Sequence, residues 1–157
     1  MTEKAQRAQA RRLLVRWGKT TAFCARRQRE IVDYEQLIAG VGDIKPQQLT
    51  GMPFGGGTSD TTAWSAAQLE ELKRRYNDRI GDLKGDIKRE LDFASAMDQM
   101  LVDLEPIELT VLEYRYKHDR KPQNVAICLG YSLRQVERIE QEAVDKLRDC
   151  IEITVMT

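Results

Sequence analysis

The chain has 157 residues and a formal net charge of zero, and 32% of its residues are charged while 41% are apolar. This length suits one domain or a small domain with a helical extension, and the composition is typical of a helix-rich protein with a modest core. Short apolar runs argue against a membrane span, and the first residues lack the apolar core of a secretion signal. Three cysteines without CxxC spacing and a single histidine argue against a disulfide framework and a zinc site. We therefore expect a cytoplasmic protein without membrane partner, metal or cofactor.

The zero net charge conceals an uneven distribution of charge. Residues 1–29 hold nine Lys or Arg and one Glu, whereas residues 80–113 hold nine Asp or Glu and three Lys or Arg. Residues 114–148 are basic again, with eight basic and five acidic residues. Because phosphate binding depends on local charge, overall neutrality does not exclude a nucleic-acid partner. The basic side chains of Lys4, Arg7, Arg11 and Arg16 are expected to contact either the acidic second segment or DNA.

An apolar pattern predicts a long helix over residues 3–41, although Gly18 lowers helix propensity in its middle. Residues 40–60 then contain six of the ten glycines and two of the four prolines. They have no periodic pattern, which predicts a flexible linker at about 41–60. The apolar residues before the linker recur mostly at the seven-residue spacing of one helix face, as in a coiled coil: Leu13, Trp17, Cys24, Ile31, Ile38 and Val41.

A second long helix is predicted from Ser65, because Ser65 and Gln68 have the spacing of a capping box. Two such helices predict an antiparallel hairpin over residues 1–101. A pair of helices alone cannot cover both apolar faces, so we expect a homo-oligomer formed through the hairpin. The apolar residues of the second helix recur at steps of three, four or seven: Leu69, Leu72, Tyr76, Ile80, Leu83, Ile87, Ala94, Met97 and Leu101.

Three shorter helices are predicted over residues 106–116, 122–129 and 132–151, the first two beginning with a proline. They make residues 102–153 a second domain and the whole chain all-α. The last two helices satisfy the requirements of a helix-turn-helix. Ala126 is small enough for a close helix crossing, Gly130 accepts a positive φ in the turn, and Ser132 and Gln135 form a capping box. Apolar side chains at Val125, Leu129, Val136 and Ile139 have the offsets needed to fill the wedge between the helices.

The exposed side of the last helix has the chemistry of a DNA-reading surface. At 100° per residue, Arg134, Arg138 and Gln141 project away from the expected core, with Glu137 beside them. Simple helix salt bridges, for example from Arg138 to Glu142, are the alternative. The candidate DNA-binding residues are Ser132, Arg134, Gln135, Glu137, Arg138 and Gln141, together with Arg120, Lys121 and Gln123, which lie where the preceding helix begins and suit a phosphate.

The stretches "LEPIELTVLEYRY" and "VAICLGYSLRQVERIEQEAVDKL" carry a family resemblance. Residues 104–148 resemble the region 4 helix-turn-helix of bacterial sigma factors. The layout of the whole chain resembles the phage-encoded RinA/ArpU-type transcriptional regulators. That resemblance implies activation of phage late genes, for packaging or lysis, by promoter binding, with RNA polymerase as a further candidate partner. One departure is the sequence at 121–124, Lys-Pro-Gln-Asn, where relatives usually have an acidic start that contains an aromatic residue.

Other functions fit the sequence less well. The run "FGGGTSD" lacks the Gly-Lys-Ser/Thr of a phosphate loop, and one histidine supports no catalytic triad, so we expect no enzyme. Asp82, Asp86 and Glu90 share a helix face, but basic residues alternate with them, which favours a solvated charged face over a metal cluster. Two alternative functions stay open: a phage small terminase subunit that recognises packaging-site DNA, and a helical adaptor that binds only protein.

Overall fold

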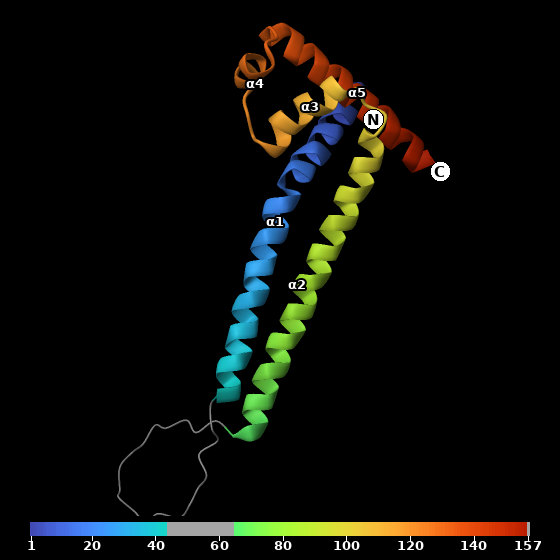
Figure 1. The fold of residues 1–157 in the computed structure, drawn as a ribbon. Coiled ribbons are helices and arrows are strands. Elements are labelled where there is room, and N and C mark those ends of the chain that lie inside the picture. Colours follow the sequence, from blue (N-terminus) through green and yellow to red (C-terminus); the bar gives the residue numbers. More distant parts are fainter. Residues whose placement is uncertain (44–64, 157) are drawn as a thin grey trace, which may run out of the picture. The chain divides into compact units, whose positions relative to one another are not determined.

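The computed structural model describes residues 1–43 and 65–156, which form helices joined by short turns, with no strand among them (Figure 1). The all-α prediction is therefore confirmed. Most of the linker predicted at about 41–60 lies outside the described residues. No helix in the described ranges is both long enough and apolar enough to span a bilayer. The elements are α1 (Glu3–Asp43), α2 (Ala66–Leu101), α3 (Pro106–Leu112), a π-helical turn η1 (Glu113–Lys117), α4 (Pro122–Leu129) and α5 (Leu133–Met156).

Helix boundaries agree with the sequence signals where a capping or stop residue marks them. The predicted capping box at the start of α2 is present, because the Ser65 backbone N–H donates to Gln68 Oε1 at 2.8 Å and the Gln68 N–H donates to Ser65 Oγ at 3.2 Å. The helix predicted over residues 106–116 is α-helical only to Leu112. A π-helical turn follows, in which the His118 N–H donates to the Glu113 carbonyl at 3.0 Å. α5 is longer than predicted and ends at Met156.

The chain divides into two compact units, and the first contains residues 26–87. In it, the later residues of α1 pack against the earlier residues of α2, which makes the two segments antiparallel. Ile31, Ile80 and Leu83 form the buried core. The rings of Tyr34 and Tyr76 have centroids 5.7 Å apart. This unit confirms the predicted packing of two long helices.

The second unit contains residues 1–25 and 88–157, so the boundary predicted between residues 101 and 102 lies inside it. The reason is that apolar residues near the start of α1 complete the core of the carboxy-terminal helices. The core therefore contains residues from both predicted domains rather than from one. Its buried members are Ala10, Leu14 and Trp17 of α1, Met97 and Leu101 of α2, Leu112 of α3, and Ala143, Val144 and Leu147 of α5.

Candidate nucleic-acid interface

The turn between α4 and α5 has the geometry of a helix-turn-helix. Gly130 has φ 71° and ψ 27°, the left-handed conformation that glycine adopts without strain. The Tyr131 N–H donates to the Ala126 carbonyl at 3.1 Å, as in a glycine-terminated helix end. α5 then begins with the predicted capping box, because the Ser132 N–H donates to Gln135 Oε1 at 2.9 Å and the Gln135 N–H donates to Ser132 Oγ at 3.2 Å.

The wedge between the two helices is filled by apolar side chains. Val125 and Val136 are fully buried, and Ala126 and Ile139 are 7% and 9% exposed. Val111 of α3 packs against the same cluster, with Leu129 partly buried beside it. These contacts explain why α4 and α5 keep a fixed crossing. The predicted roles of the small residue, the glycine and the aliphatic residues are therefore confirmed.

A buried carboxylate connects η1 to α5 behind the turn. Glu140 is 7% exposed, its Oε2 accepts from Arg115 Nε at 3.1 Å, and its Oε1 accepts from the Tyr116 hydroxyl at 3.0 Å. Burial and the adjacent Glu140 carboxylate raise the pKa of Tyr116 to about 12. The Arg115 guanidinium also donates to the Arg120 carbonyl at 2.9 Å. The three side chains thus hold η1, α5 and the segment before α4 together.

A second buried carboxylate connects α3 to α5. Glu108 has a side chain only 4% exposed, and Lys146 Nζ lies 2.5 Å from its Oε1. Hydrogen bonding to Glu108 raises the pKa of Lys146. Within the described residues Glu108 Oε2 has no hydrogen-bond partner. The pair therefore leaves a buried charge that depends on Lys146 for compensation.

The first two turns of α5 present the predicted polar face to solvent. Arg134, Gln135, Glu137 and Arg138 are exposed. Arg134 forms no hydrogen bond or ion pair within the described part of the chain. The alternative salt bridge does form, with Arg138 Nε 3.9 Å from Glu142 Oε1, but these side chains are 68% and 59% exposed. Ion pairs this exposed contribute little to stability and break easily, so the Arg138 guanidinium remains available.

Gln141 does not share this free surface. Its Oε1 accepts from Arg11 Nη2 at 2.8 Å, and its Nε2 donates to Asp145 Oδ1 at 3.3 Å. Helical spacing places Gln141 on the outer side of α5, but it could not indicate that α1 lies against that side. The polar atoms of this amide are therefore already occupied, in contrast to the side chains of Arg134 and Arg138.

The predicted phosphate-contact residues lie at the start of α4, where they are exposed. Lys121 and Gln123 flank Pro122 in the first turn. Arg120 is more constrained, because its Nη1 lies 2.8 Å from Cys128 Sγ and its guanidinium lies 5.1 Å from the centre of the Tyr114 ring. The backbone N–H groups of a helix start, together with Lys121, form a suitable environment for an anion.

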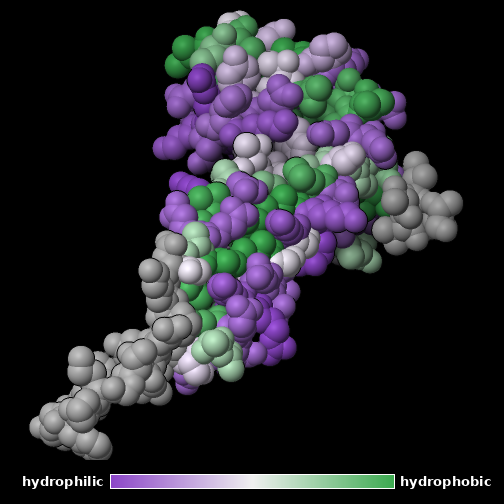
Figure 2. Space-filling view, turned by 60° about the horizontal axis from the view of Figure 1, so that its bottom comes forward, coloured by the Kyte–Doolittle hydropathy of each residue, from purple (hydrophilic) through white to green (hydrophobic). Residues whose placement is uncertain are grey.

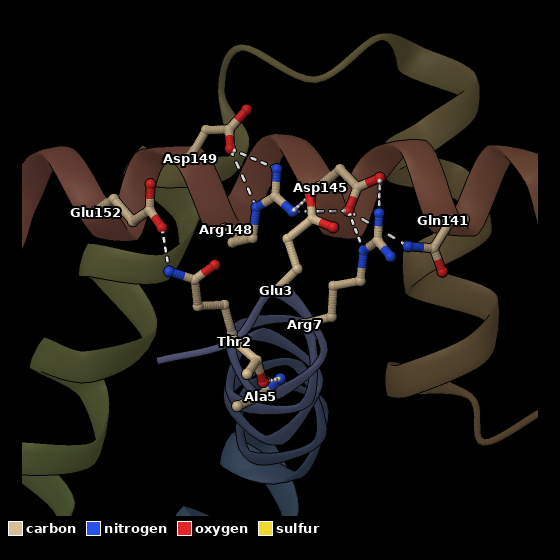
Figure 3. A network of polar contacts seen from close by, with 10 residues as sticks. Thr2, Glu3, Ala5, Arg7, Gln141, Asp145, Arg148, Asp149 and Glu152 are labelled. Atoms are coloured by element: carbon tan, nitrogen blue, oxygen red, sulfur yellow. Dashed lines mark hydrogen bonds and ion pairs between the residues drawn. The ribbon is translucent and has the colours of Figure 1, made fainter.

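Polar side chains of α1 fasten its first turns to the outer side of α5 (Figure 3). Arg7 Nε donates to Asp145 Oδ1 at 2.7 Å, and this hydrogen bond lowers the pKa of Asp145. Arg148 Nη1 lies 3.2 Å from Glu3 Oε1. Gln6 donates to Glu152 farther along α5. α1 therefore covers α5 beyond about residue 141 and leaves its first two turns open.

Gly18 allows α1 to approach the backbone of η1. A Cβ at this position would lie 1.9 Å from the Tyr116 carbonyl oxygen and 2.4 Å from its carbon. Lys117 of the same turn places its Nζ 4.4 Å from the centre of the Trp17 ring. The sequence indicated only that Gly18 lowers helix propensity, and nothing in it pointed to a contact with residues about 100 positions away.

The arrangement of α3, η1, α4 and α5 can be compared with known families. Residues 100–149 match the family "Sigma-70, region 4". They form a region 4-like helix-turn-helix domain. No curated protein and no solved structure is significantly similar to the chain. The match supports a regulatory role in DNA binding for this region.

The region 4-like domain also exposes apolar side chains that the sequence analysis did not select. Ile127 is 80% exposed on α4, and Tyr131 and Leu133 are each 39% exposed around the turn. Hydrophobic patches also alternate with hydrophilic ones on the face shown in Figure 2. Leu133 directly precedes Arg134, and an apolar side chain there could contact the methyl group of a thymine. Its position in the first turn of α5 was the signal that could have identified it.

Proposed function

We propose that this protein is a sequence-specific DNA-binding transcription regulator whose α5 enters the major groove. The observation that carries the proposal is that the first two turns of α5 have one buried side and one exposed side. Val136 and Ile139 are buried, while Arg134 and Arg138 extend into solvent. A recognition helix needs this division, because the same turns must pack on the domain and read base edges. An arginine can donate two hydrogen bonds to guanine.

The remaining exposed residues support the same docking. Glu137 can accept a hydrogen bond from cytosine, and Ser132 and Gln135 lie at the helix start that faces the groove. Lys121 and Gln123, with Arg120 behind them, would contact the phosphate backbone. Gln141 has weak support as a base-reading group because its amide is already bonded, and the capping box likewise occupies Ser132 Oγ and Gln135 Oε1.

The test begins with selection of bound sequences from a random DNA library, followed by competition titrations against unrelated DNA. Arg134→Ala and Arg138→Ala should each reduce the preference for the selected sequence by roughly 5- to 150-fold, since a bidentate contact contributes about 1–3 kcal/mol of discrimination. A matched control replaces Arg74 and Arg75, which are exposed arginines of α2. The proposal fails if the variant that lacks both Arg134 and Arg138 discriminates between the two DNAs as well as the variant that lacks both Arg74 and Arg75.

The resemblance to RinA/ArpU-type regulators supports a finer proposal, in which the protein activates phage late genes for packaging or lysis. RNA polymerase would then be its second partner. In vitro transcription from a promoter that carries the selected sequence tests this directly. Stimulation by wild-type protein and none by the Arg134/Arg138 variant is expected. Binding without any effect on transcription would refute the activator role but not DNA binding.

We further propose that the helical hairpin forms a homo-oligomer in the bacterial cytoplasm. Val32 and Leu37, in the unit of residues 26–87, are 41% and 49% exposed and would be covered in such an assembly. Light scattering across a wide concentration range should give a mass above that of one chain. A monomer at high concentration would contradict this.

A further inference from the structure

The basic residues of the first half of α1 fall into two groups according to their partners. Arg7 is neutralised by Asp145, and Arg16 donates to Glu90 at 2.9 Å. The Arg16 pair confirms the expected contact with the acidic second segment, whereas Arg7 pairs with α5, which was not expected. Arg11 differs, because its hydrogen-bond acceptor is the neutral amide of Gln141, at 2.8 Å. Its positive charge is therefore left without a bonded carboxylate.

The position of Arg11 relative to α5 is defined by that hydrogen bond. Gln141 follows Arg138 by three residues, so the Arg11 guanidinium lies one helical turn beyond the predicted base-reading residues. At 100° per residue, the direction of Gln141 from the axis of α5 is 20° from that of Arg134 and 60° from that of Arg138. Arg11 therefore lies on the same side of α5 as the exposed arginines.

Arg11 lines a shallow hollow of about 370 Å³. Arg11 and Gln141 line it together with Glu137, Pro122 and the Arg115–Glu140 pair. Arg115 compensates Glu140, so Glu137 is the lining carboxylate that has no ion pair within the described ranges. The hollow thus joins the start of α4, where a phosphate is expected, to the face of α5 that carries Arg134.

We propose that Arg11, held by Gln141, contacts a DNA phosphate at the edge of the major groove and makes α1 part of the DNA interface. This rests on the proposed function, because it presupposes that α5 enters the groove. When the first two turns of a helix lie among base edges, the next turn meets the backbone that borders the groove. A guanidinium delivered there from a second helix would bind phosphate without competing for bases.

A phosphate contact has a measurable signature in the salt dependence of binding. Each neutralised phosphate adds about 0.9 to the slope of log affinity against log salt. Arg11→Ala should therefore lower that slope by roughly one, so that a fourfold rise in salt weakens binding about 3.5-fold less than in the wild type. Selected and unrelated DNA should lose affinity equally, and Arg11→Lys should restore most of the slope.

Two further variants separate a phosphate contact by Arg11 from an effect of the net charge of the protein and from an effect of losing the hydrogen bond to Gln141. Arg12→Ala removes the same charge from the adjacent, exposed position, which points about 100° away around α1, and should change the slope little. Gln141→Ala keeps the Arg11 charge and should change the slope less than Arg11→Ala. The helical signal and melting temperature of each variant verify that it folds.

The inference is overturned if Arg11→Ala binds with the wild-type slope, or with the slope of Arg12→Ala. It is also overturned if Gln141→Ala reproduces the full effect, because Arg11 would then only position that amide. Absence of salt-sensitive binding by the wild type would instead refute DNA binding itself, and this contact with it.

Discussion

The close approach of α1 to η1 makes opposite predictions for two glycines of the long helices. Gly18→Ala and Gly81→Ala each gain about 1 kcal/mol of helix propensity. At Gly81 the new methyl group would meet no atom within 4 Å, so the gain is kept. At Gly18 it would lie 1.9 Å from a backbone oxygen, and that oxygen would have to move by more than 1 Å to restore an ordinary contact. Overpacking of this kind typically costs about 1–3 kcal/mol, and more where backbone must move.

Because both substitutions gain the same helix propensity, the difference between their free energies of unfolding measures the clash at position 18 alone. We expect Gly81→Ala to melt above the wild type and Gly18→Ala below it, with about 1–3 kcal/mol or more between the two variants. For a protein of this size this corresponds to roughly 2–12 °C in thermal melts followed by circular dichroism. If Gly18→Ala raised the melting temperature as much as Gly81→Ala, α1 would not pack against Tyr116 as described.

Three further predictions concern the domain and its polar contacts. Gly130→Ala places a side chain at φ 71° in open space, so it should cost about 1–2 kcal/mol through strain alone, and Gly130→Asn should lower the melting temperature less. Tyr116 should ionise at about pH 12 by ultraviolet absorbance, and Tyr116→Phe should remove that step. Because the folded pKa of Tyr116 is raised, the contribution of its neutral phenol to the stability of the fold is complete below about pH 10 and is lost as the pH rises toward 12. An unshifted titration of Tyr116 would contradict its burial beside Glu140. The pKa of Asp145 is lowered by Arg7, so its stabilisation is present above about pH 4 and lost as the pH falls through the folded value. The difference in melting temperature between the wild type and Arg7→Gln should therefore become smaller in acid. A difference that stays constant with pH would show that the Arg7–Asp145 pair is not the cause of the stability loss.

Local signals in the sequence were sufficient to predict most of the fold. Capping boxes at Ser65 and Ser132 fixed two helix starts, Pro122 fixed a third, and Gly130 marked the left-handed turn. Each of these signals acts within four or five residues, so the chain itself specifies the geometry. For the same reason the buried wedge of the helix-turn-helix could be predicted from the offsets of its aliphatic residues.

Contacts between distant segments could not be predicted in this way. Helical periodicity placed Gln141 outward on α5, but the helix that covers it comes from the other end of the sequence. Glu90 was expected on a solvated face and is instead 9% exposed, because Arg16 compensates its charge. Glu108 and Lys146 likewise pair across 38 positions. A charged residue is buried only where a partner compensates its charge, so its burial can be predicted only if that partner is known. The pattern of a single helix does not identify partners on other helices.

The covering of α5 by α1 would also limit how much DNA sequence one copy of the proposed regulator reads. In the proposed docking, the open part of α5 extends from Ser132 to Arg138, seven residues that rise about 10 Å along the helix. B-form DNA rises about 3.4 Å per base pair, so this length spans about three base pairs. Three base pairs recur too often in a genome to select a promoter, since specificity depends on the number of competing sites. Backbone contacts such as that proposed for Arg11 raise affinity without adding sequence information. The proposed selective binding would therefore need a second reading domain, and the proposed homo-oligomer would supply one from a second copy.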